Sequence, residues 1–440
     1  MATHTSRDLA SKRSASQKLV RRVAFGLGSC VIAGLAFGPL IGSAIGRSTA
    51  GHSASMVALG LKFDGAETCK GSKCHSKGDD TSPPTDRGSE NDIWENKDPH
   101  SKSFETLGNA ESKAIGAKMG IADVTTSKDC ISCHALDVPA NLQGSKFNIS
   151  EGNSCTSCHG PSEKYMTPHQ TKGWTDAQRK ANPSHDGLLK ATGLYDTRVI
   201  TARAELCTSC HLSIDNKLVA AGHPQPKFEL HYYTEFNPNN DSMPWKHWTT
   251  DAGKLEIAKV WFAGQAACVK DAMSQLAQRA TTGASGDALS QAYEQAMSHA
   301  LVFSAAATGA GVGDLSKEVA DVKAAKGNAA KLAPAATAAA AAAAKMMPAI
   351  EKMTPDAAAA GKMLAAVAGT KGYVTDAGAD GHAQAAYAVY ALASAIETAA
   401  GKDQGVVDEL VGALFPDPSA PTPAADFDAA LADLAGKLPK

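Results

Sequence analysis

The chain has 440 residues, of which 43% are hydrophobic and 20% are charged, so it can bury a core and is not expected to be disordered. The formal net charge of −2 excludes the basic character of a nucleic-acid-binding protein. Aromatic residues make up only 5%, which is few for this length. The ten cysteines are too clustered for a small disulfide-rich fold and too many for an ordinary cytosolic enzyme.

Residues 1–50 have the pattern of an export signal. Basic residues precede an uncharged run from Val23 to Gly46, and Ser48-Thr49-Ala50 then offers a cleavage site. The run is long enough to cross a bilayer, so an uncleaved membrane anchor is the alternative, although its glycines and Pro39 favour cleavage. We expect a periplasmic protein. Seven of the 43 basic and one of the 45 acidic residues lie in this segment, so 36 and 44 remain, a net charge of −8 that favours basic partners.

Composition changes near residue 250. Residues 51–250 contain eight of the ten cysteines and have Gly, Pro, Ser, Asn or Asp every few positions, which predicts short helices and long loops. Because this segment has few aliphatic residues, something other than side chains must fill its interior. Residues 251–440 are rich in alanine and predict a second domain of unknown role, a bundle of about six helices. The overall prediction is therefore a mainly α fold.

Apolar residues at three- and four-residue spacing mark the buried faces of the helices in the second domain. They are Leu255, Ala258, Phe262, Val269, Met273 and Leu276 in one helix, Val389, Leu392 and Ile396 in another, and Phe427, Leu431, Leu434 and Leu438 in the last. We expect Asp426 to cap the last helix. Helix breaks are predicted at residues 283–286, 309–313, 348, 372–381 and 416–423.

Three segments have the pattern C-x-x-C-H, and a fourth has four residues between its cysteines. This pattern is the attachment signature of c-type haem, because two thiols at this spacing can add to the vinyl groups of one porphyrin and the next histidine then lies beneath the iron. Four covalent haems would also fill the interior of the first domain. In chain order, the first motif is Cys69, Cys74 and His75, with the longer spacing; the second is Cys130, Cys133 and His134; the third is Cys155, Cys158 and His159; and the fourth is Cys207, Cys210 and His211.

Other interpretations of these cysteines explain less. Zinc ribbons do not place a histidine after every second cysteine, thioredoxin-like motifs need a βαβ setting, and disulfides leave the four histidines unexplained. The two remaining cysteines are Cys30, inside the signal, and Cys268, which we expect to be a buried apolar residue.

Six further histidines between residues 76 and 250 are candidates for the second axial positions of the four irons. Ligation by two imidazoles suits electron transfer, whereas an open position allows a small molecule to bind. The candidates are His100, His169, His185, His223, His231 and His247.

From Cys69 to Trp248 the sequence resembles the tetrahaem cytochromes c of the cytochrome c-554 type, which are electron carriers. The resemblance lies in the segments Asp98-Pro99-His100-Ser101-Lys102, Cys155 to Pro161 followed by His169, and Cys207 to Leu212. Two features depart from the family: the longer spacing between Cys69 and Cys74, and the insert from Lys77 to Glu90.

The resemblance implies that His169 is the distal ligand opposite His75 and that His100 is the distal ligand opposite His159. It also implies that the haem of His134 has no protein ligand on its distal side, although His185 or His247 could close it. For the haem of His211 we expect His223, with His231 as the alternative.

These features predict a periplasmic tetrahaem cytochrome that carries electrons between a donor and an acceptor protein. The alternative is a redox enzyme that acts on hydroxylamine, nitrite or nitric oxide at an open haem. A third interpretation, a structural subunit of a larger respiratory complex, would give the helical second domain a role.

Overall fold

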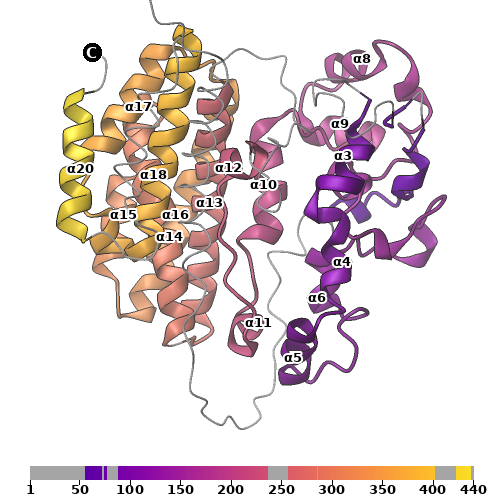
Figure 1. The fold of residues 1–440 in the computed structure, drawn as a ribbon, viewed down its shortest axis with the longest axis horizontal. Coiled ribbons are helices and arrows are strands. Elements are labelled where there is room, and N and C mark those ends of the chain that lie inside the picture. Colours follow the sequence, from indigo (N-terminus) through magenta and orange to yellow (C-terminus); the bar gives the residue numbers. More distant parts are fainter. Residues whose placement is uncertain are drawn as a thin grey trace, which may run out of the picture. The chain divides into compact units, whose positions relative to one another are not determined.

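The computed structural model describes residues 55–71, 74–76, 88–235, 256–284, 286–401 and 423–437. These ranges contain α- and 3-10 helices and no strand, and an isolated β-bridge joins Phe63 to Gln143. The prediction of a mainly α fold is confirmed. The chain forms two compact units, one of Ser48–Asp251 and one whose described residues lie within Ala252–Lys440 (Figure 1). The predicted export signal, residues 1–50, lies outside the described residues.

The first unit is built from short helices joined by irregular segments. Side chains that accept backbone N–H groups start several of these helices, as Asn109 does for α5 and Ser184 for α9. Its elements are η1 Ala66–Thr68, α3 Glu90–Lys97, η2 Pro99–Lys102, α4 Ser103–Thr106, α5 Ala110–Lys118, α6 Lys128–His134, η3 Ala140–Leu142, η4 Ile149–Glu151, α7 Cys155–His159, η5 Pro168–Gln170, α8 Trp174–Ala181, α9 His185–Thr192, α10 Ile200–His211, α11 Asn216–Ala221 and α12 Leu230–Glu235.

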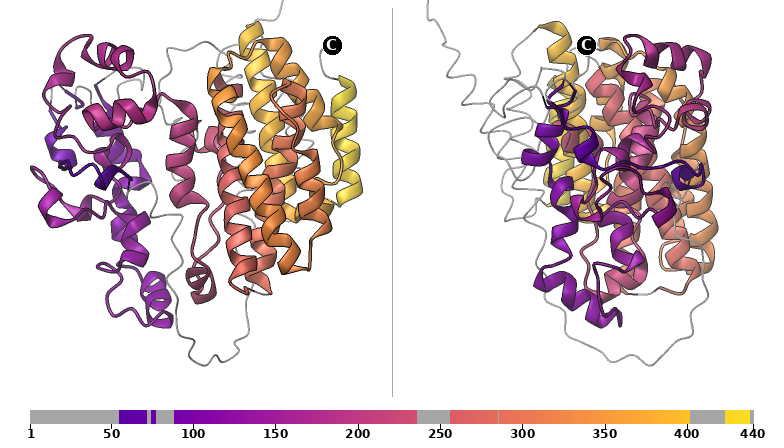
Figure 2. Two further views of the ribbon diagram at one scale, coloured as in Figure 1. Left: turned by 180° about the vertical axis from the view of Figure 1, so that it is seen from behind. Right: turned by 90° about the vertical axis from the view of Figure 1, so that its right-hand side faces the viewer.

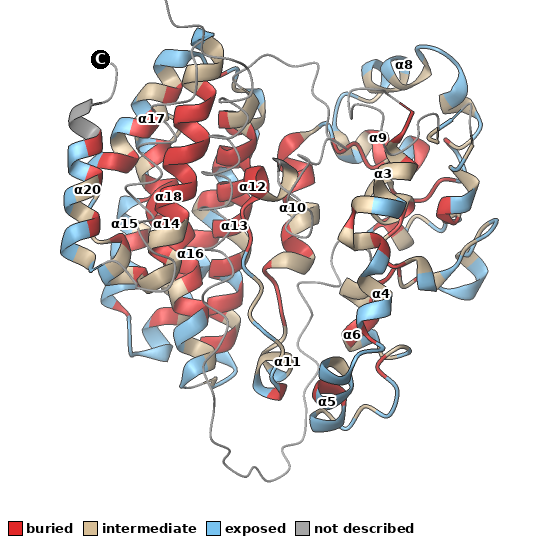
Figure 3. Cartoon of the chain, in the orientation of Figure 1, coloured by how far each residue is buried: buried red, intermediate tan, exposed pale blue. Residues whose placement is uncertain are grey.

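The apolar contacts of the first unit form small clusters rather than one large core. One cluster surrounds Phe63 and Tyr195, and a second joins Val124 to Cys130 and Ile131 at the start of α6. Figure 3 shows the same unit as a patchwork of buried and exposed segments. Clusters of this size can position the short helices, but they leave room for large apolar cofactors among them.

The second unit is a bundle of long helices that lie side by side (Figure 2). Helix α13 packs on α14 and α16, and α14 also packs on α17 and α18. Many of the contacting positions are alanine, which lets the helix backbones approach closely. The helices are α13 Glu256–Thr281, α14 Asp287–Ala310, α15 Ser316–Ala324, α16 Ala329–Lys352, α17 Ala357–Gly369, α18 Tyr373–Ala400 and α20 Ala424–Lys437.

The predicted apolar faces of the bundle helices are largely buried. Ala258, Phe262, Val269, Met273 and Leu276 are buried in α13, and α18 and α20 show the same agreement at Val389, Leu392, Phe427, Leu431 and Leu434. Ile396 is only partly buried, and Leu255 and Leu438 lie outside the described residues. Periodicity alone therefore identified most of the packing positions of α13, α18 and α20.

Two predicted helix boundaries of the bundle are wrong. Helix α16 continues through Pro348 and ends at Lys352. Proline removes one helical N–H, but this loss falls near the C-terminal end, where buried Met347 and Ile350 still hold the helix against its neighbours. Asp426 is not the cap of α20 either, because the helix starts at Ala424 and places the carboxylate in its first turn, where the helix dipole favours a negative charge.

The bundle core contains one buried polar chain. Gln265 Nε2 donates to Gln384 Oε1 at 2.9 Å, and Gln265 Oε1 lies 2.9 Å from Nδ1 of His299. Burial lowers the pKa of His299 to about 3, so this imidazole is neutral and acts as a structural donor. None of the described helices is both long enough and apolar enough to cross a bilayer.

Candidate functional site

The histidine of each C-x-x-C-H segment ends a helix in the first unit. His134 ends α6, His159 ends α7 and His211 ends α10. On a helix, positions separated by three and four residues share a face, so one turn presents both thiols and the histidine together. The segment with the longer spacing follows η1 instead, and the backbone N–H of Cys74 donates to the Gly71 carbonyl in a turn.

Three of these histidines have a second imidazole ring opposite them. The ring centroids of His75 and His169 are 6.2 Å apart, with ring planes 7° from parallel. His100 and His211 are 5.8 Å apart at 88°, and His134 and His223 are 6.3 Å apart at 70°. Two metal–nitrogen bonds of about 2.0 Å, with about 1.1 Å from each nitrogen to its ring centre, give a centroid separation of roughly 6.2 Å. All three pairs therefore have the spacing of two imidazoles on one metal ion.

The pairing in the structure agrees with one expectation and corrects two. His75 faces His169, as the resemblance implies. His100 lies beside His211 and not in the expected pair with His159, and His223 lies beside His134 and not beside His211. The reason is the course of the chain: α11 ends next to α5 and so carries His223 toward the second motif.

Each paired imidazole whose Nδ1 contact is resolved is held by a hydrogen bond at that atom. His75 Nδ1 lies 2.9 Å from Glu90 Oε2, and His100 Nδ1 lies 2.9 Å from Asp98 Oδ1. The other three use backbone carbonyl oxygens. These contacts are His134 with Ser103 at 3.0 Å, His169 with Tyr165 at 2.8 Å and His223 with Pro224 at 2.8 Å.

An imidazole that donates from Nδ1 presents the lone pair of Nε2 to a metal, and such outer hydrogen bonds fix the ring and raise its basicity. The sequence reasoning missed Glu90 and Asp98. The available signal for Asp98 was its position two residues before His100, at the N-cap of η2.

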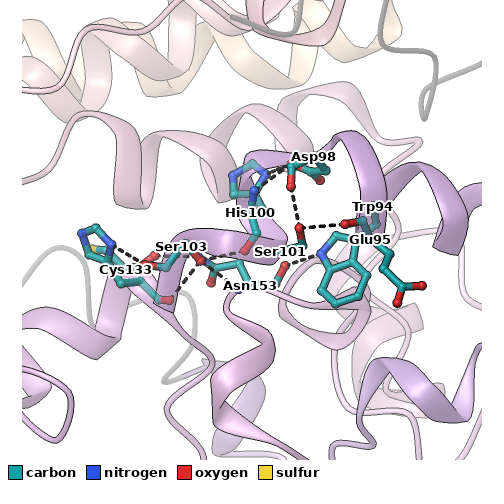
Figure 4. A network of polar contacts seen from close by, with 9 residues as sticks. Trp94, Glu95, Asp98, His100, Ser101, Ser103, Cys133 and Asn153 are labelled. Carbon is teal, nitrogen blue, oxygen red and sulfur yellow. Dashed lines mark hydrogen bonds and ion pairs between the residues drawn. The ribbon is translucent and has the colours of Figure 1, made fainter. Parts of the chain in front are cut away.

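A network of hydrogen bonds joins His100 to the second motif and to the segment before the third motif (Figure 4). Ser103 Oγ lies 2.7 Å from the His100 carbonyl oxygen and accepts the backbone N–H of Asn153. The Asn153 side chain donates to the Cys133 carbonyl at 2.6 Å, and the backbone carbonyl of Asn153 accepts the indole N–H of Trp94. The network fixes residues from α3, η2, α6 and the segment before α7 relative to one another.

The surroundings of the site shift its titrating groups in both directions. Burial opposes the charged form of His100, but Asp98 raises its pKa, and the contact with Cys133 lowers the pKa of the Cys210 thiol to about 7. Burial, with His100 and His134 nearby, lowers the pKa of His211 to about 3, and burial likewise lowers the pKa of His134. Burial raises the pKa of the Cys207 thiol to about 12. For Glu90, burial acts in the opposite direction, but its hydrogen bond to His75 and backbone donors lower the pKa to about 2. Neutral imidazole is the form that binds a metal.

The remaining candidate ligands have different surroundings. The rings of His185 and Tyr195 are 4.2 Å apart, and the buried Nε2 of His185 has no hydrogen-bond partner among the described residues. His231 is buried, and its backbone N–H donates to Glu229 at 2.9 Å. His247 lies outside the described residues.

The donor set fits c-type haem, which these motifs imply. Paired histidines at metal-sharing distance stand next to cysteine pairs of the right spacing. Asn91, 2% exposed, has neither its amide nitrogen nor its amide oxygen bonded among the described residues, while its backbone N–H donates to the His75 carbonyl. An unpaired buried amide is costly unless a further polar group satisfies it, and the carboxylates of a haem are such groups.

Residues 68–160 match the family model described as cytochrome c554 and c-prime. This segment belongs to the c554-type cytochromes c. It therefore carries covalently bound c-type haem and takes part in electron transfer. The match spans 93 of the 440 residues and includes the first three motifs but not Cys207 to His211. Searches of the curated proteins and of the solved structures gave no match.

The matched segment and the fourth motif lie in the same unit of the chain. His100, inside the matched segment, lies beside His211, outside it. The fourth motif is therefore part of the same site in the structure.

Proposed function

We propose that this protein is an exported tetrahaem cytochrome that carries electrons between two redox proteins. One pair of cysteines would hold each haem, and the histidine that follows the pair would bind its iron. The pairs are Cys69 and Cys74, Cys130 and Cys133, Cys155 and Cys158, and Cys207 and Cys210, followed by His75, His134, His159 and His211.

The observation that carries this proposal is the set of three imidazole pairs at 5.8–6.3 Å. When bound, c-type haem supplies an iron that changes oxidation state by one electron. Two imidazoles hold such an iron six-coordinate in both states, so little rearrangement opposes the change. The hydrogen bonds at Nδ1 keep the rings in place. This arrangement favours a carrier over an enzyme.

The motifs also lie close to one another. The side chains of Cys69 and Cys155 lie next to each other, and so do those of Cys133 and Cys210. Each contact joins two different motifs, so cofactors attached at these positions are neighbours. Neighbouring cofactors are what electron transfer through a protein requires.

For the motif at His159, we propose His185 as the distal ligand, with His231 and His247 as alternatives. The backbone N–H of Tyr195 donates to the His159 carbonyl at 2.9 Å, and the Tyr195 ring contacts His185. The buried His185 Nε2, which has no partner among the described residues, is the atom that would bind the iron.

Export and acidity support a periplasmic carrier with basic partners. Residues 1–50 carry the signal pattern, and attachment of c-type haem takes place outside the cytoplasm. Without that segment the net charge is −8, which would steer basic redox proteins toward the chain. We expect the rate of electron exchange with a basic partner to fall as ionic strength rises, which a stopped-flow salt series measures. Attachment of the helical unit to a larger respiratory complex would be seen as co-purification.

The central experiment is the intact mass of the mature protein together with a haem assay. We expect four covalent haems and an N-terminus near residue 50, and the variant Cys210→Ser should lose the normal thioether attachment of one haem. Fewer than three haems would refute the proposal. Turnover of hydroxylamine, nitrite or nitric oxide by the purified protein would support the enzyme instead.

A further inference from the structure

The ring of His223 stands opposite the proximal histidine of the second motif. Its centroid lies 6.3 Å from that of His134, with the ring planes at 70°. The other two imidazole pairs have separations of 6.2 and 5.8 Å. The third pair therefore has the same metal-sharing spacing, although it joins residues from α6 and from the end of α11.

Local hydrogen bonds hold both rings of this pair. Gly222 ends α11 with a φ of 106°, a left-handed conformation that turns the chain sharply, and the backbone N–H of His223 then donates to the Leu218 carbonyl at 2.8 Å. The Nδ1 atom of His223 lies 2.8 Å from the Pro224 carbonyl oxygen, and that of His134 lies 3.0 Å from the Ser103 carbonyl oxygen. In both rings Nε2 is then the metal-binding atom.

The helices that carry the two rings are also fixed. Helix α11 packs on α5, and the backbone of α5 lies so close to Val124 that a Cβ on Gly116 would overlap the Val124 side chain. Val124 in turn belongs to the apolar cluster that contains Cys130 and Ile131 of α6. A continuous set of contacts therefore leads from the second motif to the helix before His223.

We infer that His223 is the distal ligand of the haem attached at Cys130 and Cys133, opposite His134. This inference rests on the proposed function, because it requires haem at that motif. It departs from the resemblance to the c-554 type, in which the second haem has no protein ligand on its distal side. With His134 and His223 both bound, the iron held at this motif would have no open position for nitrite, nitric oxide or hydroxylamine, and the haem would serve electron transfer.

The test compares the full-length haem-loaded protein with its variants His223→Ala and Lys217→Ala. Lys217 is an exposed residue of the same helix and serves as the matched control. Electron paramagnetic resonance counts high-spin haems, and titration with cyanide or nitric oxide counts irons that bind a small ligand. We expect His223→Ala to add one high-spin haem and one binding iron per chain, and Lys217→Ala to add none.

An unchanged number of high-spin haems in His223→Ala, with four haems still attached, would overturn the assignment of His223 alone. A wild-type count below three haems would refute the proposed function instead, so the two failures differ. His223→Met provides a second variant if the alanine variant folds poorly. Thioether ligation raises the haem potential, so we expect this variant to remain low-spin with one potential raised, and no change in any potential would overturn the inference.

Discussion

The carboxylate of Asp98 offers a direct test of how this chain sets the potential of an axial imidazole. Its Oδ1 atom accepts both the backbone N–H of His100 and the Nδ1–H of the same ring, each at 2.9 Å. The substitution Asp98→Asn removes the negative charge but keeps an oxygen that can accept both bonds. The negative charge of Asp98 stabilises the ferric state. We therefore expect its removal to raise the reduction potential of the haem that we propose between His100 and His211.

The magnitude follows from the position of the charge. The carboxylate oxygen lies 2.9 Å from Nδ1, and the ring and one metal–nitrogen bond place the charge about 7 Å from the iron. The Asp98 side chain is only 7% exposed, so an effective dielectric constant of about 20 applies. Coulomb's law then gives about 2 kcal/mol, which is on the order of 100 mV for a one-electron couple.

Spectroelectrochemical titration of the holoprotein measures this shift, and Glu95→Gln is the control. Glu95 lies on the preceding helix and pairs with Lys70 in a solvent-exposed ion pair, so its substitution removes the same charge without contact to an imidazole. We expect Glu95→Gln to shift the haem potential by less than a third of the shift that Asp98→Asn causes. The reasoning is refuted if the two variants move the potentials equally. Glu90→Gln, next to His75 but with a 31% exposed carboxyl, should give an intermediate shift.

Three further predictions concern the stability of the two units. Asp196 accepts two hydrogen bonds from Arg179. Burial disfavours the ionised carboxyl, but the ion pair with Arg179 lowers its pKa below the unfolded value. The stability that this ion pair contributes is therefore present above about pH 4 and is lost as pH falls through the folded pKa. Asp196→Asn should cost about 2 kcal/mol in neutral urea unfolding and less at pH 2, and an equal cost at both pH values would contradict the pairing. Gly381→Ala would force a Cβ against the backbone carbonyl of Tyr373 and should cost about 1–3 kcal/mol in thermal unfolding, so a neutral result would exclude this close approach. Trp261 is fully buried in α13 and its indole N–H has no partner among the described residues, so Trp261→Phe should change stability by less than about 1.5 kcal/mol while Trp261→Ala costs about 3–5 kcal/mol, as chemical denaturation can test.

The haem-attachment pattern could be predicted from the sequence because it is local. Two cysteines and a histidine within five residues lie on one turn of helix wherever that turn sits in the fold, as at Cys155 to His159. The helix breaks at 283–286 and 309–313 were equally local, because glycines end helices by their own backbone freedom. The break expected at Pro348 failed because burial of neighbouring side chains outweighed one missing hydrogen bond.

The partners of the axial histidines were decided by the tertiary structure alone. His100 and His211, or His134 and His223, are far apart in the chain, and no periodicity relates them. Their contact depends on where α11 packs and on the network through Ser103 and Asn153. The sequence by itself determined which residues can attach haem. The packing of the short helices determined which imidazoles face one another, because each pair is assembled from separate elements.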